Sequence, residues 1–216
     1  MPEARIEIEA DDGGLDAFVA CPDGAGRCPP LILLGDRDGL TPALETRARR
    51  LAGHGYFVLA PDWARRSIED RREDADAWLD HLADERRVDD ARVGVAGLGA
   101  GANLALRLAA WRAERIAAVA AFGGRGFGPA TAREIAQCIN GVVRLGWPLG
   151  ATSARIGVLE AALSAADVDF ETEIYGEQPD WIGLIDLFAR ALHPDSRAVF
   201  GEPGHLTGVH LAPHNP

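Results

Sequence analysis

Two kinds of hydrophobic pattern alternate along this chain. Short apolar runs are typical of buried strands, and longer segments with apolar residues on one side are typical of helices. Two early segments instead alternate polar and apolar residues around an Asp-Asp-Gly-Gly turn, which predicts an antiparallel hairpin. The hairpin strands are expected at residues 5–9 and 15–20, further strands at 30–34, 56–60, 93–96, 116–122 and 168–175, and helices at 42–55, 67–85, 101–111, from about 131, 153–166 and 181–192.

The order of these elements predicts the architecture. A chain that alternates strands and helices through short connections folds into a mostly parallel sheet with helices on both faces. An apolar stretch at residues 142–145 continues the pattern, and the 216 residues suit one such α/β domain with an irregular tail at 201–216. Ligands of these sheets bind at the carboxyl ends of the strands, so functional residues are expected there.

Composition and charge exclude several classes of partner. The 22 basic and 33 acidic residues give a net charge of −11, which disfavours nucleic acid and acidic membrane surfaces. No apolar run approaches the roughly 20 residues that span a bilayer, and the polar N-terminus differs from a signal peptide. Three cysteines, an odd and sparse set, indicate reduced thiols in a cytoplasm. All basic residues are Arg, which excludes a lysine Schiff base and, with the richness in Ala and Gly, indicates a bacterial source.

The most informative segment is the glycine-rich turn at residues 97–101, between a strand and a helix. Gly97-x-Gly99-x-x-Ala102 formally fits a dinucleotide-binding turn, but the next strand has no acidic residue at its end to hold a ribose. The alternative is a nucleophile elbow, Gly-x-nucleophile-x-Gly, in which the middle residue stands at the floor of a pocket. We favour the elbow, which places Gly99 at the position of the nucleophile, and expect no cofactor.

The chain resembles the dienelactone hydrolase family of α/β-hydrolases over nearly its full length. The most specific parts are the elbow and residues 53–62, Gly-His-Gly-Tyr-Phe-Val-Leu-Ala-Pro-Asp. The resemblance implies an α/β-hydrolase fold with an N-terminal antiparallel hairpin. The family's triad does not carry over, because Gly99, Pro148 and Asp180 stand at or near the positions of the nucleophile, the acid and the histidine. Because a triad works as a unit, its loss predicts a degenerate hydrolase without acyl-transfer chemistry.

The same resemblance suggests which parts of a pocket remain. The oxyanion hole of the family corresponds to the backbone N–H groups of Arg37 and Ala100, with open volume expected above Gly99. The family's carboxylate-binding Arg corresponds to Arg66, or to Arg65 with a one-residue gap, unless both are solvated charges at a helix start. Asp36 matches a family Glu and is the candidate general acid or base, the alternative being a solvated turn residue.

Three further residues are candidates for ligand binding. Trp147 and Trp181 replace or neighbour the triad positions and could line an apolar slot, although core packing is the commoner fate of Trp. Asp180 is a second pocket carboxylate or a surface residue. No metal is expected, because the histidines are spread over separate parts of the chain and do not gather on one rigid scaffold. His54 lies at a helix cap, His81 on a charged helix, His193 at the end of the last helix, and His205, His210 and His214 in the tail.

Three functions follow from these residues. The first is an enzyme that binds a small carboxylate and performs lyase, isomerase or cyclase chemistry without a triad, with Asp36 as acid or base. The second is a non-catalytic binding or regulatory protein that keeps the pocket. The third is a hydrolase that uses a water activated by a carboxylate. The partner is a small molecule in each case, and the oligomeric state stays open, a homodimer included.

Overall fold

The computed structural model describes residues 1–10, 13–24, 26–64, 66–89, 92–151, 153–177 and 179–192. Arg65, four of the six histidines (His193, His205, His210 and His214) and the expected tail at 201–216 lie outside these residues. The strands are β1 (Glu3–Ala10), β2 (Gly13–Ala20), β3 (Pro30–Leu34), β4 (Phe57–Pro61), β5 (Val93–Leu98), β6 (Ile116–Phe122), β7 (Val142–Pro148) and β8 (Phe170–Tyr175). The helices are α1 (Pro42–Gly53), α2 (Ile68–Asp84), α3 (Ala100–Trp111), α4 (Pro129–Cys138), α5 (Ser153–Ala165) and α6 (Trp181–Leu192).

The strands form one sheet in the order β1-β2-β4-β3-β5-β6-β7-β8 within the described part of the chain. The first three strands in this order pair antiparallel, and every pair from β4 to β8 is parallel. The predicted fold class, a mostly parallel sheet with an antiparallel N-terminal hairpin, is therefore confirmed. One strand is longer than expected: β7 continues from Leu145 to Pro148, because Trp147 and Pro148 pair with the end of β8.

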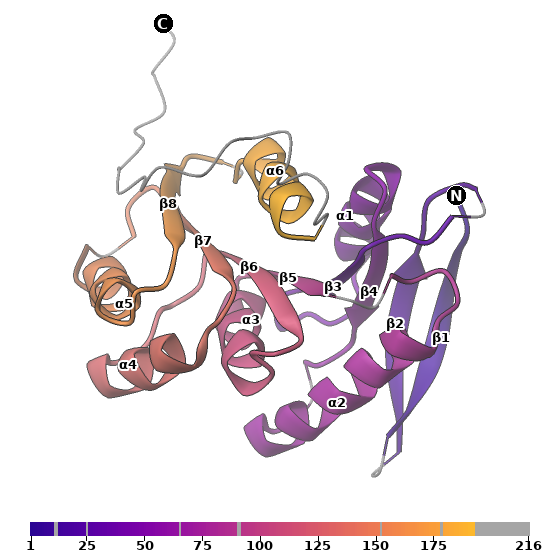
Figure 1. Cartoon of the computed structure of the whole chain (residues 1–216), viewed down its shortest axis with the longest axis horizontal. Coiled ribbons are helices and arrows are strands. Elements are labelled where there is room, and N and C mark those ends of the chain that lie inside the picture. The colour runs from indigo at the N-terminus through magenta and orange to yellow at the C-terminus, as the bar shows by residue number, and fades with distance from the viewer. Residues whose placement is uncertain are drawn as a thin grey trace, which may run out of the picture.

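Helices cover both faces of the sheet, as predicted (Figure 1). Helices α1 and α6 lie on one face and bury Leu44, Leu51, Leu184 and Phe188 in one apolar cluster. Helices α2 to α5 lie on the other face and bury a second cluster that includes Trp78. The central strands are buried on both sides, which explains why they read as continuous apolar runs.

Local sequence signals set the starts of two helices. Thr41 accepts a hydrogen bond from the backbone of Leu44, with Pro42 at the first helical position of α1. Ser67 and Asp70 form a reciprocal capping box at the start of α2. None of the helices in the described residues is both long enough and apolar enough to cross a membrane.

Candidate active site at the carboxyl edge of the sheet

The turn between β5 and α3 has the geometry of an elbow. Gly99 has φ 58° and ψ −120°, a conformation that a residue with a side chain adopts only under strain. The two flanking glycines allow a close approach of backbones: a Cβ on Gly97 would collide with the carbonyl of Gly101, and one on Gly101 with the carbonyls that end β3. The helix begins at Ala100, one residue earlier than expected, so Gly99 stands directly at its N-terminus.

The carboxylate of Asp36 occupies the space above the elbow. Its Oδ1 accepts hydrogen bonds from the backbone N–H groups of Arg37 (2.8 Å) and Ala100 (3.0 Å). These are the two amides that the family resemblance assigns to an oxyanion hole. A Cβ on Gly99 would lie less than 3.0 Å from Asp36 Oδ2, so the volume expected to be open is filled by a carboxylate from the chain itself.

This arrangement fixes the orientation of the Asp36 carboxylate. Oδ1 accepts from the Ala100 amide at the positive end of α3 and from the Arg37 amide in the loop after β3. Oδ2 lies toward Gly99 and has no hydrogen-bond donor in the described part of the chain. Asp36 is exposed, so a small molecule can reach it from solvent. A fixed carboxylate with one available oxygen can accept or return a proton, which suits a general base or acid.

Tyr175 is a second polar group near the elbow, and the sequence analysis missed it. It is the last residue of β8, the strand after which the resemblance placed a histidine. A Cβ on Gly123 would lie 3.0 Å from the Tyr175 hydroxyl and 3.9 Å from the Gly99 nitrogen, so both atoms surround one small space. Burial, and then the charge of Glu173, raise the pKa of Tyr175, so its hydroxyl stays protonated and can donate a hydrogen bond at neutral pH. In the sequence, the only signal that could have pointed to Tyr175 is its position at the end of a predicted strand.

Of the two arginines expected to bind a carboxylate, Arg66 is described and already holds a protein carboxylate. Its Nε and Nη2 donate to Asp74 at 2.8 and 2.7 Å, and the Asp74 side chain is only 1% exposed. A bidentate pair with a buried carboxylate anchors Arg66 to α2. Arg65 lies outside the described residues. Arg71 of α2, which the sequence analysis did not single out, lies over the ring of Trp63.

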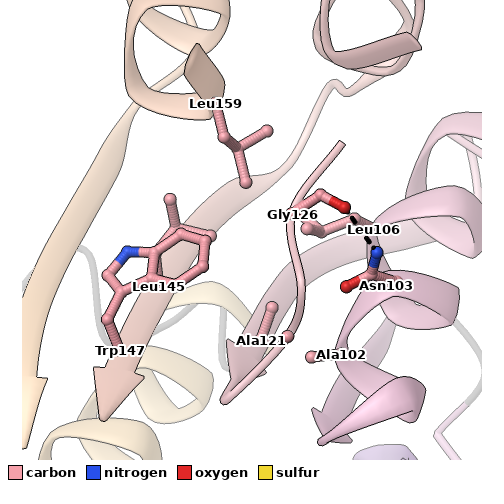
Figure 2. Close-up of a pocket in the computed structure, with 9 residues that line it drawn as sticks. Ala102, Asn103, Leu106, Ala121, Gly126, Leu145, Trp147 and Leu159 are labelled. Atoms are coloured by element: carbon pink, nitrogen blue, oxygen red, sulfur yellow. Dashed lines mark hydrogen bonds between the residues drawn. The ribbon is translucent and has the colours of Figure 1, made fainter. Parts of the chain in front are cut away.

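Trp147 and Trp181 lie on opposite faces of the sheet and do not form a common slot. Trp147 is buried in the cluster beneath α2 to α5, and Trp181 packs beside Phe122 on the face of α1 and α6. Trp147 lines a cavity of about 10 Å³, room for roughly one water molecule, together with Leu159 and Gly126 (Figure 2). Asn103 of α3 holds this loop through a hydrogen bond from its amide to the Gly126 carbonyl.

Asp180 takes part in an ionic network around Arg144. Its Oδ1 accepts a hydrogen bond from the backbone N–H of Ile182, so Asp180 caps the start of α6. Its Oδ2 accepts a hydrogen bond from Arg144 at 3.2 Å. Arg144 is 9% exposed and also binds Glu171 and Glu173. The structure therefore gives Asp180 a capping and pairing role, and Arg144 is the buried charge that this carboxylate helps to neutralise.

No group of three or more potential metal-ligating side chains occurs among the described residues. His54 caps the C-terminus of α1, and His81 lies in the last turn of α2. Cys21 and Cys28 are buried, Cys138 is exposed, and all three are free thiols.

Comparisons with known proteins show that the fold is shared with α/β-hydrolases. No protein-family model matches the chain, and no curated protein matches its sequence. The fold is similar to a dienelactone hydrolase from Anabaena variabilis (TM-score 0.70, 21% identity, 89% of this chain and 99% of that chain). It is also similar to a dienelactone hydrolase-like promiscuous phosphotriesterase from metagenomic libraries (TM-score 0.75, 19% identity, 88% and 98%).

A candidate dienelactone hydrolase from Klebsiella pneumoniae is similar over the same span (TM-score 0.72, 20% identity, 92% and 94%). The chain therefore has an α/β-hydrolase fold, in the form found in dienelactone hydrolases. At identities below 25%, these likenesses concern the fold.

The Arg144 network yields a stability prediction. We expect Arg144→Ala to lower the free energy of unfolding by about 3 kcal/mol, because it leaves the carboxylate of Glu173, 15% exposed, without its cation. Urea unfolding measures this change. Arg190→Ala is the matched control: Arg190 is 55% exposed and pairs with Glu171, so its loss should cost about 0–1 kcal/mol. Equal losses for the two variants would contradict a special role for the buried cation.

The elbow yields a coupling prediction. Gly99→Ala should destabilise the protein by about 1–3 kcal/mol, because Ala is strained at this φ and its Cβ meets Asp36. In the double variant with Asp36→Ala, the collision between the new Cβ and the carboxylate is relieved. The loss of stability in the double variant should therefore differ by at least about 0.5 kcal/mol from the sum of the losses in the two single variants. Gly53→Ala in α1, where a Cβ meets open space, serves as the control and should not destabilise. Thermal and urea unfolding of wild type, the two single variants, the double variant and the control test this, and strict additivity of Gly99→Ala with Asp36→Ala would rule out the contact.

Proposed function

We propose that this protein binds a small carboxylate-bearing molecule at the carboxyl edge of the sheet and transforms it without a catalytic triad. The reaction is of lyase, isomerase or cyclase type, with Asp36 as general acid or base. The observation that supports this proposal most directly is the Asp36 carboxylate, held by two backbone amides at the elbow where a hydrolase carries its nucleophile. The proposed location is the cytoplasm.

Proton transfer needs a base and a group that stabilises the charge left behind. Asp36 Oδ2, which accepts no hydrogen bond from the described residues and lies toward Gly99, serves as the base. The hydroxyl of Tyr175, which borders the small space beside Gly123 together with the Gly99 nitrogen, is the proposed donor to the oxygen on which charge develops. A carboxylate and a phenol hydroxyl near the same elbow are a pairing that suits isomerisation or elimination next to a carbonyl group.

A non-catalytic binding protein is the second candidate. One observation favours it: the amides of Arg37 and Ala100 are already satisfied by Asp36, as in a site that has no transition state to stabilise. Turnover distinguishes the two candidates, because a binder is stabilised by its ligand and leaves the ligand unchanged.

The first test concerns acyl-transfer chemistry. We expect no turnover of p-nitrophenyl esters and no labelling by a fluorophosphonate, because Gly99 offers no oxygen or sulfur to attack. Steady turnover of esters without labelling would instead favour a hydrolase that uses a water held by a carboxylate. Burst kinetics with covalent labelling would overturn the proposal, because they require a nucleophile.

The second test concerns Asp36. A thermal-shift screen of small carboxylates finds ligands, and each ligand is then examined for chemical change by NMR. We expect Asp36→Asn to lower turnover by at least 100-fold, because Asn can still accept from the two amides and cannot take a proton. Asp38→Asn, in the same exposed loop, is the control and should retain turnover. An Asp36→Asn protein with full turnover would remove Asp36 from the chemistry.

A further inference from the structure

Strand β8 is an edge strand whose outer side is open. It ends the sheet beside β7, and no described strand pairs with its other side (Figure 1). On the β7 side, the carbonyls of Asp169 and Tyr175 accept hydrogen bonds from the backbone N–H groups of Val143 (2.9 Å) and Leu149 (2.7 Å). Backbone groups alternate in direction along a strand, so the even-numbered residues of β8 direct their N–H and C=O groups away from β7. These residues are Phe170, Thr172 and Ile174.

The side chains of these three residues give the open edge a partly apolar face. They lie on the face of the sheet that α2 to α5 cover, because Ile174 is opposite Trp147 in the register and Phe170 packs against the same cluster. Ile174 is 45% exposed and is the only exposed large apolar side chain on a strand in the described part of the chain. Edge strands of stable monomers are commonly protected by charges, so this edge is typical of a surface that pairs with another strand.

Charge distinguishes β8 from the other edge of the sheet. At β1, Glu7 and Glu9 are exposed and form no ion pair within the described residues. At β8, the two glutamates of the strand are held by Arg144 and Arg190. Because the chain carries a net charge of −11, a second copy is repelled at β1, whereas at β8 it meets acids that two cations balance.

We propose that a second copy of this chain pairs with β8 in antiparallel orientation, which joins two sheets across a two-fold axis. Outward-facing residues must lie opposite outward-facing residues, and only a register centred on Thr172 pairs all three of them. Thr172 then lies opposite the partner's Thr172, and Ile174 lies against the partner's Phe170. In each pair, both N–H groups donate to the carbonyl opposite. Glu171 faces the partner's Glu173, and each is already bound by an arginine of its own copy.

The edge is complementary to itself, which favours a second copy over a strand of another protein. A two-fold axis repeats every contact, so the contact between Ile174 and the partner's Phe170 occurs twice, as does the neutralised pair of glutamates. This pairing needs no chemistry at Asp36, so it is independent of the proposed function.

Sedimentation equilibrium of the full chain at increasing concentration tests the pairing. We expect a reversible dimer of twice the 23.0 kDa chain mass. Ile174→Asp should weaken this dimer at least tenfold, because it places a charge against the partner's Phe170, twice by symmetry. Ile182→Asp is the matched control: Ile182 is 70% exposed on α6, which packs over β5 to β7, so the same new charge should leave the dimer unchanged. Melting temperatures at low concentration check that both variants are folded.

Oxidative cross-linking tests the register. The background is Cys138→Ser, which removes the exposed native thiol. Thr172→Cys should form a disulfide with its own copy, because the two Cα atoms lie about 5.5 Å apart in the proposed pair. Ile174→Cys is the control and should not cross-link, because its two copies lie about 14 Å apart along the strands. Diamide serves as the oxidant, and the dimer band on a non-reducing gel is the readout.

Three results would overturn the proposal. A wild-type chain that stays monomeric at every concentration leaves this edge to a strand of another protein or to another segment of this chain. A dimer that Ile174→Asp weakens no more than Ile182→Asp is built on a different surface. Cross-linking through Ile174→Cys that equals or exceeds cross-linking through Thr172→Cys contradicts a two-fold axis at Thr172.

Discussion

The carboxylate of Asp36 in the amide cradle of the elbow is the interaction on which the site depends. Two N–H groups at the start of α3 and after β3 would otherwise face solvent, and the positive end of a helix favours a negative charge there. Because Gly99 has no side chain, the carboxylate fits closely against the turn. Two amides that in a hydrolase bind the substrate's developing oxyanion here bind a side chain of the protein itself.

The sheet brings this interaction together with its neighbours. Asp36 and Arg37 follow β3, Trp63 follows β4, the elbow follows β5, and Tyr175 ends β8. All these strands are parallel, so segments far apart in the chain meet at the carboxyl edge. Arg71 reaches the same edge from α2 by lying on Trp63. The proposed base, the elbow and the proposed hydroxyl donor thus come from three separate segments: the loop after β3, the turn after β5 and the end of β8.

Much of the fold was predictable because hydrophobic period and glycine turns are local signals. The strands from β3 to β6 are continuous apolar runs, and the elbow is visible as Gly97, Gly99 and Gly101. The family resemblance also identified Arg37, Ala100 and Asp36 as neighbours of one turn. It did not indicate that Asp36 fills the cradle, because a sequence gives no side-chain direction.

Pairings across the chain account for the rest of the site. Whether Arg66 is available to a ligand depends on Asp74, one of several acids on α2, and the role of Asp180 depends on Arg144 of β7. Strand register and helix placement decide on which face of the sheet Trp147 and Trp181 lie, and composition does not reveal either. Arg71 looked like one more charge on a charged helix, and only the buried ring below it sets it apart.

The tight fit between Gly99 and Asp36 constrains how this protein can evolve. A mutation that installs serine or cysteine at position 99 meets the carboxylate at once, so the acid must be lost first. That earlier loss removes the partner of two amides and, under our proposal, the activity in use. Each single step is thus selected against, and a lineage that has adopted this pair is held away from ester hydrolysis.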